Sequence, residues 1–164
     1  MFRVSCHSCL SAPVADSDVF PAGKATLAFS AISTARLNAP ISGIDFSIKL
    51  PPGMSVATSG GTSGAIATAS VTPGSGLVGS NLAFGSYSAS NGKTRLSMVT
   101  TSDSYRSGEF LCLICTVAPN TSITLGSLKA LNAPVTVLKA VGYDPVTKNT
   151  VTLTTSVKVT LGAR

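Results

Sequence analysis

The chain has 164 residues, of which 44% are hydrophobic and 11% are charged, and its formal net charge is +6. No run reaches the roughly 18 consecutive apolar residues of a transmembrane helix, so we expect no membrane span. The twelve basic residues are scattered rather than gathered with aromatic residues, so we expect no nucleic-acid binding.

Residues 1–18 are mixed and irregular, and we expect a flexible lead or the remnant of an export segment there. The remaining residues, 19–164, are expected to form a single domain. Glu109 is the only glutamate and glutamine is absent, so the residues that usually cover the wet face of a helix are missing. A surface of serine and threonine favours strands instead.

Alternation of apolar and polar side chains predicts the first strands. Residues 24–32 and 43–50 are apolar at every second position, the period of a strand with one buried face. Pro51-Pro52-Gly53 ends the second of these strands, because proline cannot donate a ladder hydrogen bond. A short strand is expected at residues 54–58 and a weak one at residues 65–71, within a stretch that otherwise has the composition of a loop.

Turn signals delimit the strands of the second half. Asn91-Gly92 indicates a hairpin, because both residue types tolerate positive φ, and Asp144-Pro145 starts a turn. Residues 109–117 are apolar on both faces and are predicted to form a central, covered strand. The other strands expected here are residues 82–87, 93–100, 123–131, 135–141 and 150–161. Eight or nine strands and no helix predict an all-β fold, an antiparallel jelly-roll β-sandwich.

Three segments follow one another in the order ISGIDFSIKLPPGMSV, NGKTRLSMVTT and GEFLCLICTV. Together they resemble the cohesin-like modules of the carbohydrate-binding-module superfamily, over roughly residues 24–161. The resemblance implies a nine-stranded jelly roll that is not an enzyme. It also implies that one sheet face binds a dockerin module or, in related members, a polysaccharide. By strand order this face would draw on residues 43–50, 82–87, 93–100 and 123–131, with Asp45, Ser47, Lys49, Tyr87 and Arg95 as candidate partner-binding residues.

From this resemblance we expect a non-catalytic, exported binding module, extracellular or in the cell envelope. Its partner would be a dockerin-like or other surface protein. The alternative is a carbohydrate-binding module or a structural cell-surface domain. Sugars stack on aromatic rings, and because the chain has no tryptophan, the platform would fall to Tyr87, Tyr105 and Tyr143.

Catalysis and metal binding find little support in the residues. The sole histidine, His7, lies in the irregular lead, and the carboxylates form no recognisable pair, so no catalytic site is expected. No cofactor or metal is expected either, since a zinc site would have to combine Cys6 and Cys9 with two thiols of a buried strand. Calcium is left open at the acidic loops of Asp103 and Asp144, which lack the dense ligand spacing of a calcium loop.

The four cysteines carry two further expectations. Val4-Ser5-Cys6 resembles the end of a bacterial lipoprotein signal, which would make Cys6 a lipid anchor if the natural start lies upstream. An artificial start of the chain is the competing interpretation. Cys112 and Cys115 lie in the apolar strand and are predicted to be small buried hydrophobic residues with unreactive thiols.

Overall fold

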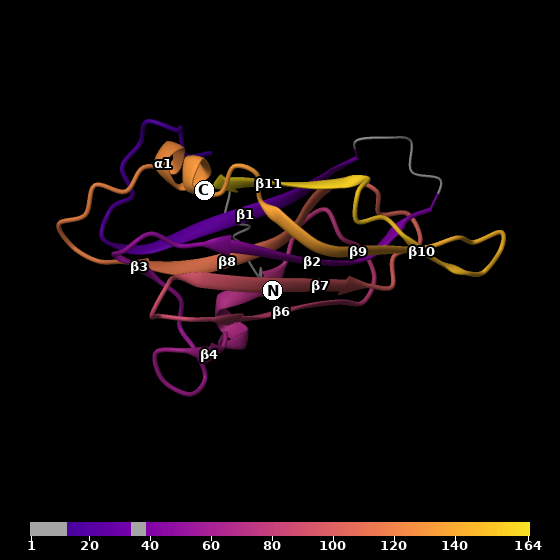
Figure 1. Cartoon of the computed structure of the whole chain (residues 1–164), viewed down its shortest axis with the longest axis horizontal. Helices are drawn as coiled ribbons and strands as arrows, with labels where there is room; N and C mark the ends of the chain where they lie inside the picture. Colours follow the sequence, from indigo (N-terminus) through magenta and orange to yellow (C-terminus); the bar gives the residue numbers. More distant parts are fainter. Residues whose placement is uncertain (1–12, 34–38) are drawn as a thin grey trace, which may run out of the picture.

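Two antiparallel β-sheets make up most of the computed structural model, which describes residues 13–33 and 39–164 (Figure 1). The five-stranded sheet has the order β11-β1-β8-β3, with β5 also paired with β8, and the six-stranded sheet has the order β10-β9-β2-β7-β6-β4. The strands are β1 (Gly23–Ser33), β2 (Ile41–Lys49), β3 (Met54–Ser55), β4 (Gly64–Ala65), β5 (Val71–Pro73), β6 (Asn81–Tyr87), β7 (Lys93–Thr100), β8 (Gly108–Val117), β9 (Thr136–Tyr143), β10 (Thr150–Thr152) and β11 (Val157–Ala163). The all-β prediction is confirmed, while the jelly-roll connectivity stays a prediction.

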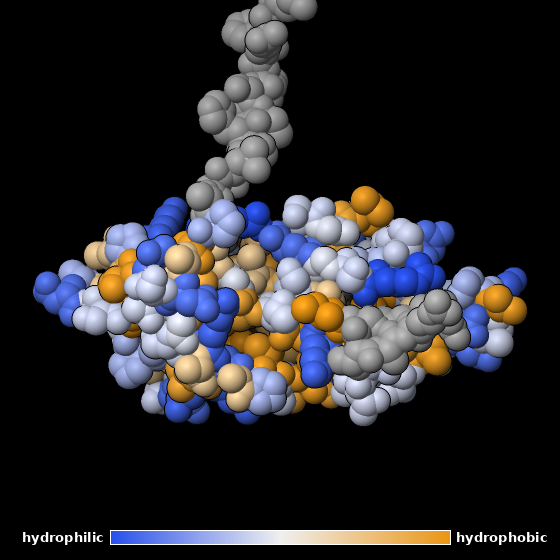
Figure 2. Space-filling model, turned by 90° about the horizontal axis from the view of Figure 1, so that it is seen from above, coloured by the Kyte–Doolittle hydropathy of each residue, from blue (hydrophilic) through white to orange (hydrophobic). Residues whose placement is uncertain are grey.

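The core lies between the two sheets, and alternation along β2 shows how it is built. Ile44, Phe46 and Ile48 are buried, whereas the residues between them face outward. At the surface, hydrophobic residues also appear between hydrophilic ones in the view from above (Figure 2). The Phe46 ring lies 4.9 Å from that of Phe29 in β1 and 5.5 Å from that of Phe110 in β8, measured between ring centroids. Phe46 belongs to the six-stranded sheet, and Phe29 and Phe110 belong to the five-stranded sheet, so the aromatic cluster joins the two layers.

The central position predicted for residues 109–117 is confirmed, because β8 pairs with β1, β3 and β5. Its inward side chains, among them Phe110 and Leu113, are fully buried. Its outer face is less covered than predicted, since Cys112 and Ile114 are only half-buried there.

The strand predicted at residues 123–131 is wrong, because most of this segment is the helix α1 (Leu125–Leu131). The Thr124 hydroxyl accepts the Ser127 N–H at 3.0 Å, and the Ser127 hydroxyl accepts the Thr124 N–H at 3.1 Å, which is a capping box. Leu125 and Leu128, three residues apart, point together into the core. The helix lies beside β11, so it cannot contribute to the six-stranded sheet (Figure 1).

The remaining differences concern short elements. The strand predicted at residues 65–71 is replaced by the end of β4, a 3-10 turn η1 (Thr68–Ser70) and the start of β5. The strand predicted at residues 150–161 is divided into β10 and β11. The hairpin predicted at Asn91-Gly92 is present, but only Gly92, and not Asn91, has a positive φ. The turn predicted to start at Asp144-Pro145 connects β9 and β10, which pair with each other.

Candidate binding face on the six-stranded sheet

The outer face of the six-stranded sheet is organised in rows of cross-strand neighbours around β2. Asp45 pairs with Ser97 of β7 and Lys139 of β9. Ser47 pairs with Arg95 and Thr136 in the next row, and Lys49 pairs with Lys93. The predicted residues Asp45, Ser47, Lys49 and Arg95 therefore do share one face.

The charges on this face are only partly compensated. Arg95 donates from Nε to Asp45 Oδ1 at 3.0 Å and forms a second contact through its terminal nitrogen, and the Ser97 hydroxyl donates to the same carboxylate at 3.1 Å. The hydrogen bond from Arg95 is the main cause that lowers the pKa of Asp45. Lys49, Lys93 and Lys139 have no ion-pair partner among the described residues, so the face is positively charged around one internal pair.

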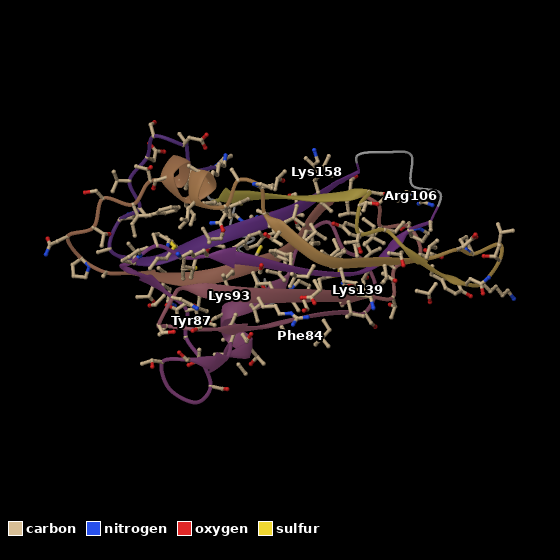
Figure 3. The ribbon with its side chains drawn as sticks, in the orientation of Figure 1. Phe84, Tyr87, Lys93, Arg106, Lys139 and Lys158 are labelled. Atoms are coloured by element: carbon tan, nitrogen blue, oxygen red, sulfur yellow. The ribbon has the colours of Figure 1, made fainter. Side chains whose placement is uncertain are left out.

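Apolar side chains cover the other end of the same face, and the sequence did not point to them. Leu82, Phe84 and Val99 are 59%, 47% and 49% exposed, although Leu82 and Val99 are direct cross-strand neighbours. With Val141 of β9 they form what we call the apolar patch: Leu82, Phe84, Val99 and Val141. In Figure 3 Phe84 and Lys139 lie toward the same half of the sheet.

A hollow of about 360 Å³ opens in the apolar patch, with Gly43 at its floor. Gly43 pairs with Val99 on one side and Val141 on the other. A Cβ added at Gly43 would lie 3.3 Å from Val141 Cγ2, so a side chain there would crowd the hollow. Lys139 and Phe84 form part of the rim, which places a cation and an aromatic ring beside the same hollow.

Tyr87 was predicted on this face, and that prediction is wrong, because Tyr87 points into the core and is only 7% exposed. It pairs with Thr94, which is also buried. The small residues Ala83 and Gly85 face inward with it, and a Cβ on Gly85 would lie 3.0 Å from Leu96 Cδ2. The inner side of β6 therefore carries small residues, and the buried side chains of Leu96 and Met98 in β7 occupy the core beside them. The large side chains of β6, Leu82 and Phe84, lie on the outer face.

The tyrosines do not form a sugar-binding platform. Tyr87 and Tyr105 are buried, and only Tyr143 is exposed. The Tyr105 hydroxyl donates to the Gly108 carbonyl at 2.8 Å, and burial raises the pKa of this phenol. The exposed aromatic ring that borders the hollow is Phe84.

The two thiols in β8 have different surroundings. Cys115 is fully buried, and burial raises its pKa to about 12. Cys112 is half-buried and donates to Glu109 Oε1 at 3.2 Å, while Arg164 donates to its sulfur at 3.0 Å. Burial and the hydrogen bond to Glu109 raise the pKa of Cys112, although Arg164 acts in the opposite direction.

We expect both thiols to react slowly in the native protein, because the thiolate is the reactive form and is disfavoured at each site. The measurement is labelling with a maleimide reagent at neutral pH, with and without denaturant. A variant with Cys6→Ser and Cys9→Ser leaves Cys112 and Cys115 as the only targets. Cys115 should label only after unfolding, and Cys112 much more slowly than in denaturant. Rapid native labelling of either residue would contradict this expectation.

Other predicted features fall outside the described residues or find no counterpart within them. The expectations for Cys6, His7 and Cys9, including the lipid anchor, concern residues that are not described. Within residues 13–33 and 39–164 no group of three or more potential metal ligands is found. The same part of the chain contains no helix long and apolar enough to cross a membrane.

Comparisons of the chain with protein-family models, with curated proteins and with solved structures found no match. The resemblance to cohesin-like modules therefore stays a prediction.

Proposed function

We propose that this domain is a non-catalytic binding module that holds a protein partner on the outer face of its six-stranded sheet. The observation that carries the proposal is the apolar patch, where Phe84, Val99 and Val141 line a hollow together with Lys139, which has no ion-pair partner among the described residues. Protein interfaces combine an apolar centre, often with an aromatic anchor, and a polar rim. Phe84 is the candidate anchor and Lys139 is the candidate rim beside it, while Lys93 and Lys49 add positive charge further along the same face.

The charges of the rim indicate what the partner should present. Asp45 is already satisfied by Arg95 and Ser97, so the face offers mainly positive charge. A partner with an apolar side chain for the hollow and acidic groups around it would be complementary. Because exposed charges mainly set association rates and specificity, salt should slow the association more than it speeds dissociation.

We further propose that the protein is extracellular or part of the cell envelope, and that its partner is a dockerin-like or other surface protein. This part is supported by the resemblance to cohesin-like modules and by a surface rich in hydroxyl groups. The alternative of a carbohydrate-binding module has less support, since two of the three tyrosines are buried.

The test is to capture proteins from the culture medium of the source organism on the immobilised chain, identify them, and measure the affinity of each purified candidate. Phe84→Ser should lower the affinity for a true partner by about 30-fold, which corresponds to the loss of roughly 2 kcal/mol of binding free energy at an interface anchor. Val146→Ser is the matched control, because Val146 is 87% exposed in the turn between β9 and β10.

Two outcomes would contradict the proposal. One is that Phe84→Ser and the control bind every captured protein as tightly as the original chain does. The other is that Phe84→Ser keeps its protein partners but loses retention on insoluble polysaccharide. The second outcome would favour the carbohydrate-binding alternative.

A further inference from the structure

A second cavity, of about 610 Å³, lies at one end of the domain, between the Pro51-Pro52-Gly53 turn and the β6–β7 hairpin. Two backbone hydrogen bonds brace its walls: Leu50 N–H donates to the Gly92 carbonyl at 2.9 Å, and Ala118 N–H donates to the Gly53 carbonyl at 2.8 Å. We call this cavity the end pocket. In Figure 3 Tyr87 and Lys93 lie at this end, away from Phe84 and Lys139.

Tyr87 supplies an unpartnered polar group to the end pocket. Its side chain is 7% exposed and lines the pocket, yet its hydroxyl has no hydrogen-bond partner among the described residues. No side-chain oxygen that is sealed from solvent lacks a partner in the described part of the chain. The Tyr87 hydroxyl is therefore not sealed from solvent, and Tyr87 is one of the residues that line the end pocket. Burial raises the pKa of this phenol, so near neutral pH it is a hydrogen-bond donor.

Two further donors line the same pocket. Asn91 accepts the Lys93 N–H at 2.9 Å through its side-chain oxygen, which leaves its amide NH₂ group available. Lys49 has no ion-pair partner among the described residues. No acidic residue is among the described residues that line the pocket, so its polar groups are mostly donors and its charge is positive.

Apolar walls complete the end pocket. Pro51, Pro52 and Met54 lie on one side, and Ala89 and Ala118 are also part of the lining. Such a mixture suits a ligand with one acceptor-rich group and a partly apolar body. A carboxylate is the simplest group that accepts hydrogen bonds from several donors while carrying the charge opposite to that of lysine.

We propose that the end pocket binds a carboxylate-bearing small molecule, with the carboxylate held by Tyr87, Lys49 and Asn91 and the body lying against Pro51, Pro52 and Met54. This site is separate from the apolar patch and does not rest on the proposed function, although Lys49 lies both on the binding face and in the lining of the end pocket. The ligand chemistry has two sources, a free aliphatic acid or a sugar acid, and they differ only in the body that meets the apolar wall.

The experiment titrates the full chain with hexanoate and, separately, with galacturonate, and follows backbone amide shifts by NMR. Hexanol and galactose are the uncharged controls. At least one acid should shift the amides of Gly53, Asn91 and Gly92 in a saturable way, and its uncharged control should not. Whichever acid binds more tightly identifies the source of the carboxylate.

Tyr87→Phe is the decisive variant, because it removes only the hydroxyl. It should weaken binding at least about tenfold, which is the usual effect of losing a hydrogen bond to a charged group. Its melting temperature should stay unchanged, because the hydroxyl has no partner within the described protein. Tyr143→Phe is the matched control, because Tyr143 is exposed and does not line the end pocket. It lies at one end of β9, whereas Thr136 at the other end pairs with Ser47, two residues from the pocket residue Lys49.

Three results would overturn the proposal. The first is that neither acid gives a saturable shift up to about 100-fold molar excess over a millimolar sample. The second is that the uncharged analogues bind as well as the acids. The third is that Tyr87→Phe binds as tightly as the original chain. Loss of binding in Phe84→Ser but not in Tyr87→Phe would likewise assign the ligand to the apolar patch instead.

Discussion

Replacing Phe46 with alanine is expected to lower the free energy of unfolding by about 3–5 kcal/mol, the usual range for an emptied core aromatic site. The Phe46 side chain is fully buried and its ring contacts Phe29 and Phe110, which come from the opposite sheet. Removing it leaves a cavity between the layers, and close-packed neighbours can fill such a cavity only in part. Urea denaturation, followed by far-ultraviolet circular dichroism, measures the change.

The control for this prediction is the next residue in β2. Ser47 faces outward, and Ser47→Ala should change the free energy of unfolding by less than about 0.5 kcal/mol. Equal losses at positions 46 and 47 would contradict the assignment of the two faces. A loss well below 3 kcal/mol at Phe46 would mean that the two layers are less tightly packed than the ring distances indicate.

Gly92→Ala is expected to be strongly destabilising for two separate reasons. Gly92 has φ of +70°, a left-handed conformation that costs an L-residue roughly 1–2 kcal/mol. A Cβ at this position would also lie 2.2 Å from the Leu50 carbonyl oxygen, so the hairpin would have to move away from β2. The total loss should therefore exceed the backbone cost alone, and the denaturation midpoint should fall accordingly.

Gly60→Ala serves as the control for the glycine prediction. Gly60 has no positive φ, and no atom lies within 4 Å of an added Cβ, so its replacement should change stability by less than about 0.5 kcal/mol. Because Gly92 also lines the end pocket, Gly92→Ala should disturb ligand binding there along with stability. If Gly92→Ala proved as harmless as Gly60→Ala, the close approach of the hairpin to β2 would be wrong.

The sequence alone predicted the strands whose faces differ clearly. In β2 the alternation of apolar and polar residues predicted both the strand and its buried face, because a strand places successive side chains on opposite sides. The same reasoning placed Asp45, Ser47 and Lys49 together, and the strand order implied by the resemblance to cohesin-like modules added Arg95, which the structure places on the same face. The assignments on β2 needed only the period of the strand and the contrast between its two faces.

The segment over residues 123–131 shows where local pattern was ambiguous. Its leucines are spaced in a way that fits a short helix, and Thr124 with Ser127 can form a capping box, yet the segment is too short for periodicity to decide. The tertiary structure decides through Asn132, whose side chain accepts the Lys49 N–H at 2.7 Å and donates to the Lys49 carbonyl at 2.9 Å. This contact links the end of α1 to the end of β2, which are 83 residues apart in the chain.

What the sequence determined about this protein is therefore an all-β chain with a polar face on β2 and β7. Only the tertiary structure decided which side of β6 is exposed, and with it the apolar patch and the inward position of Tyr87. The pattern of β6 does not contain this information, because Leu82 and Phe84 are more apolar than Ala83 and Gly85 and would by themselves be expected inside. The register with β7 reverses that order: Leu96 and Met98 fill the core opposite Gly85 and Ala83, and a shift by one residue would turn every side chain of β6 to the other face.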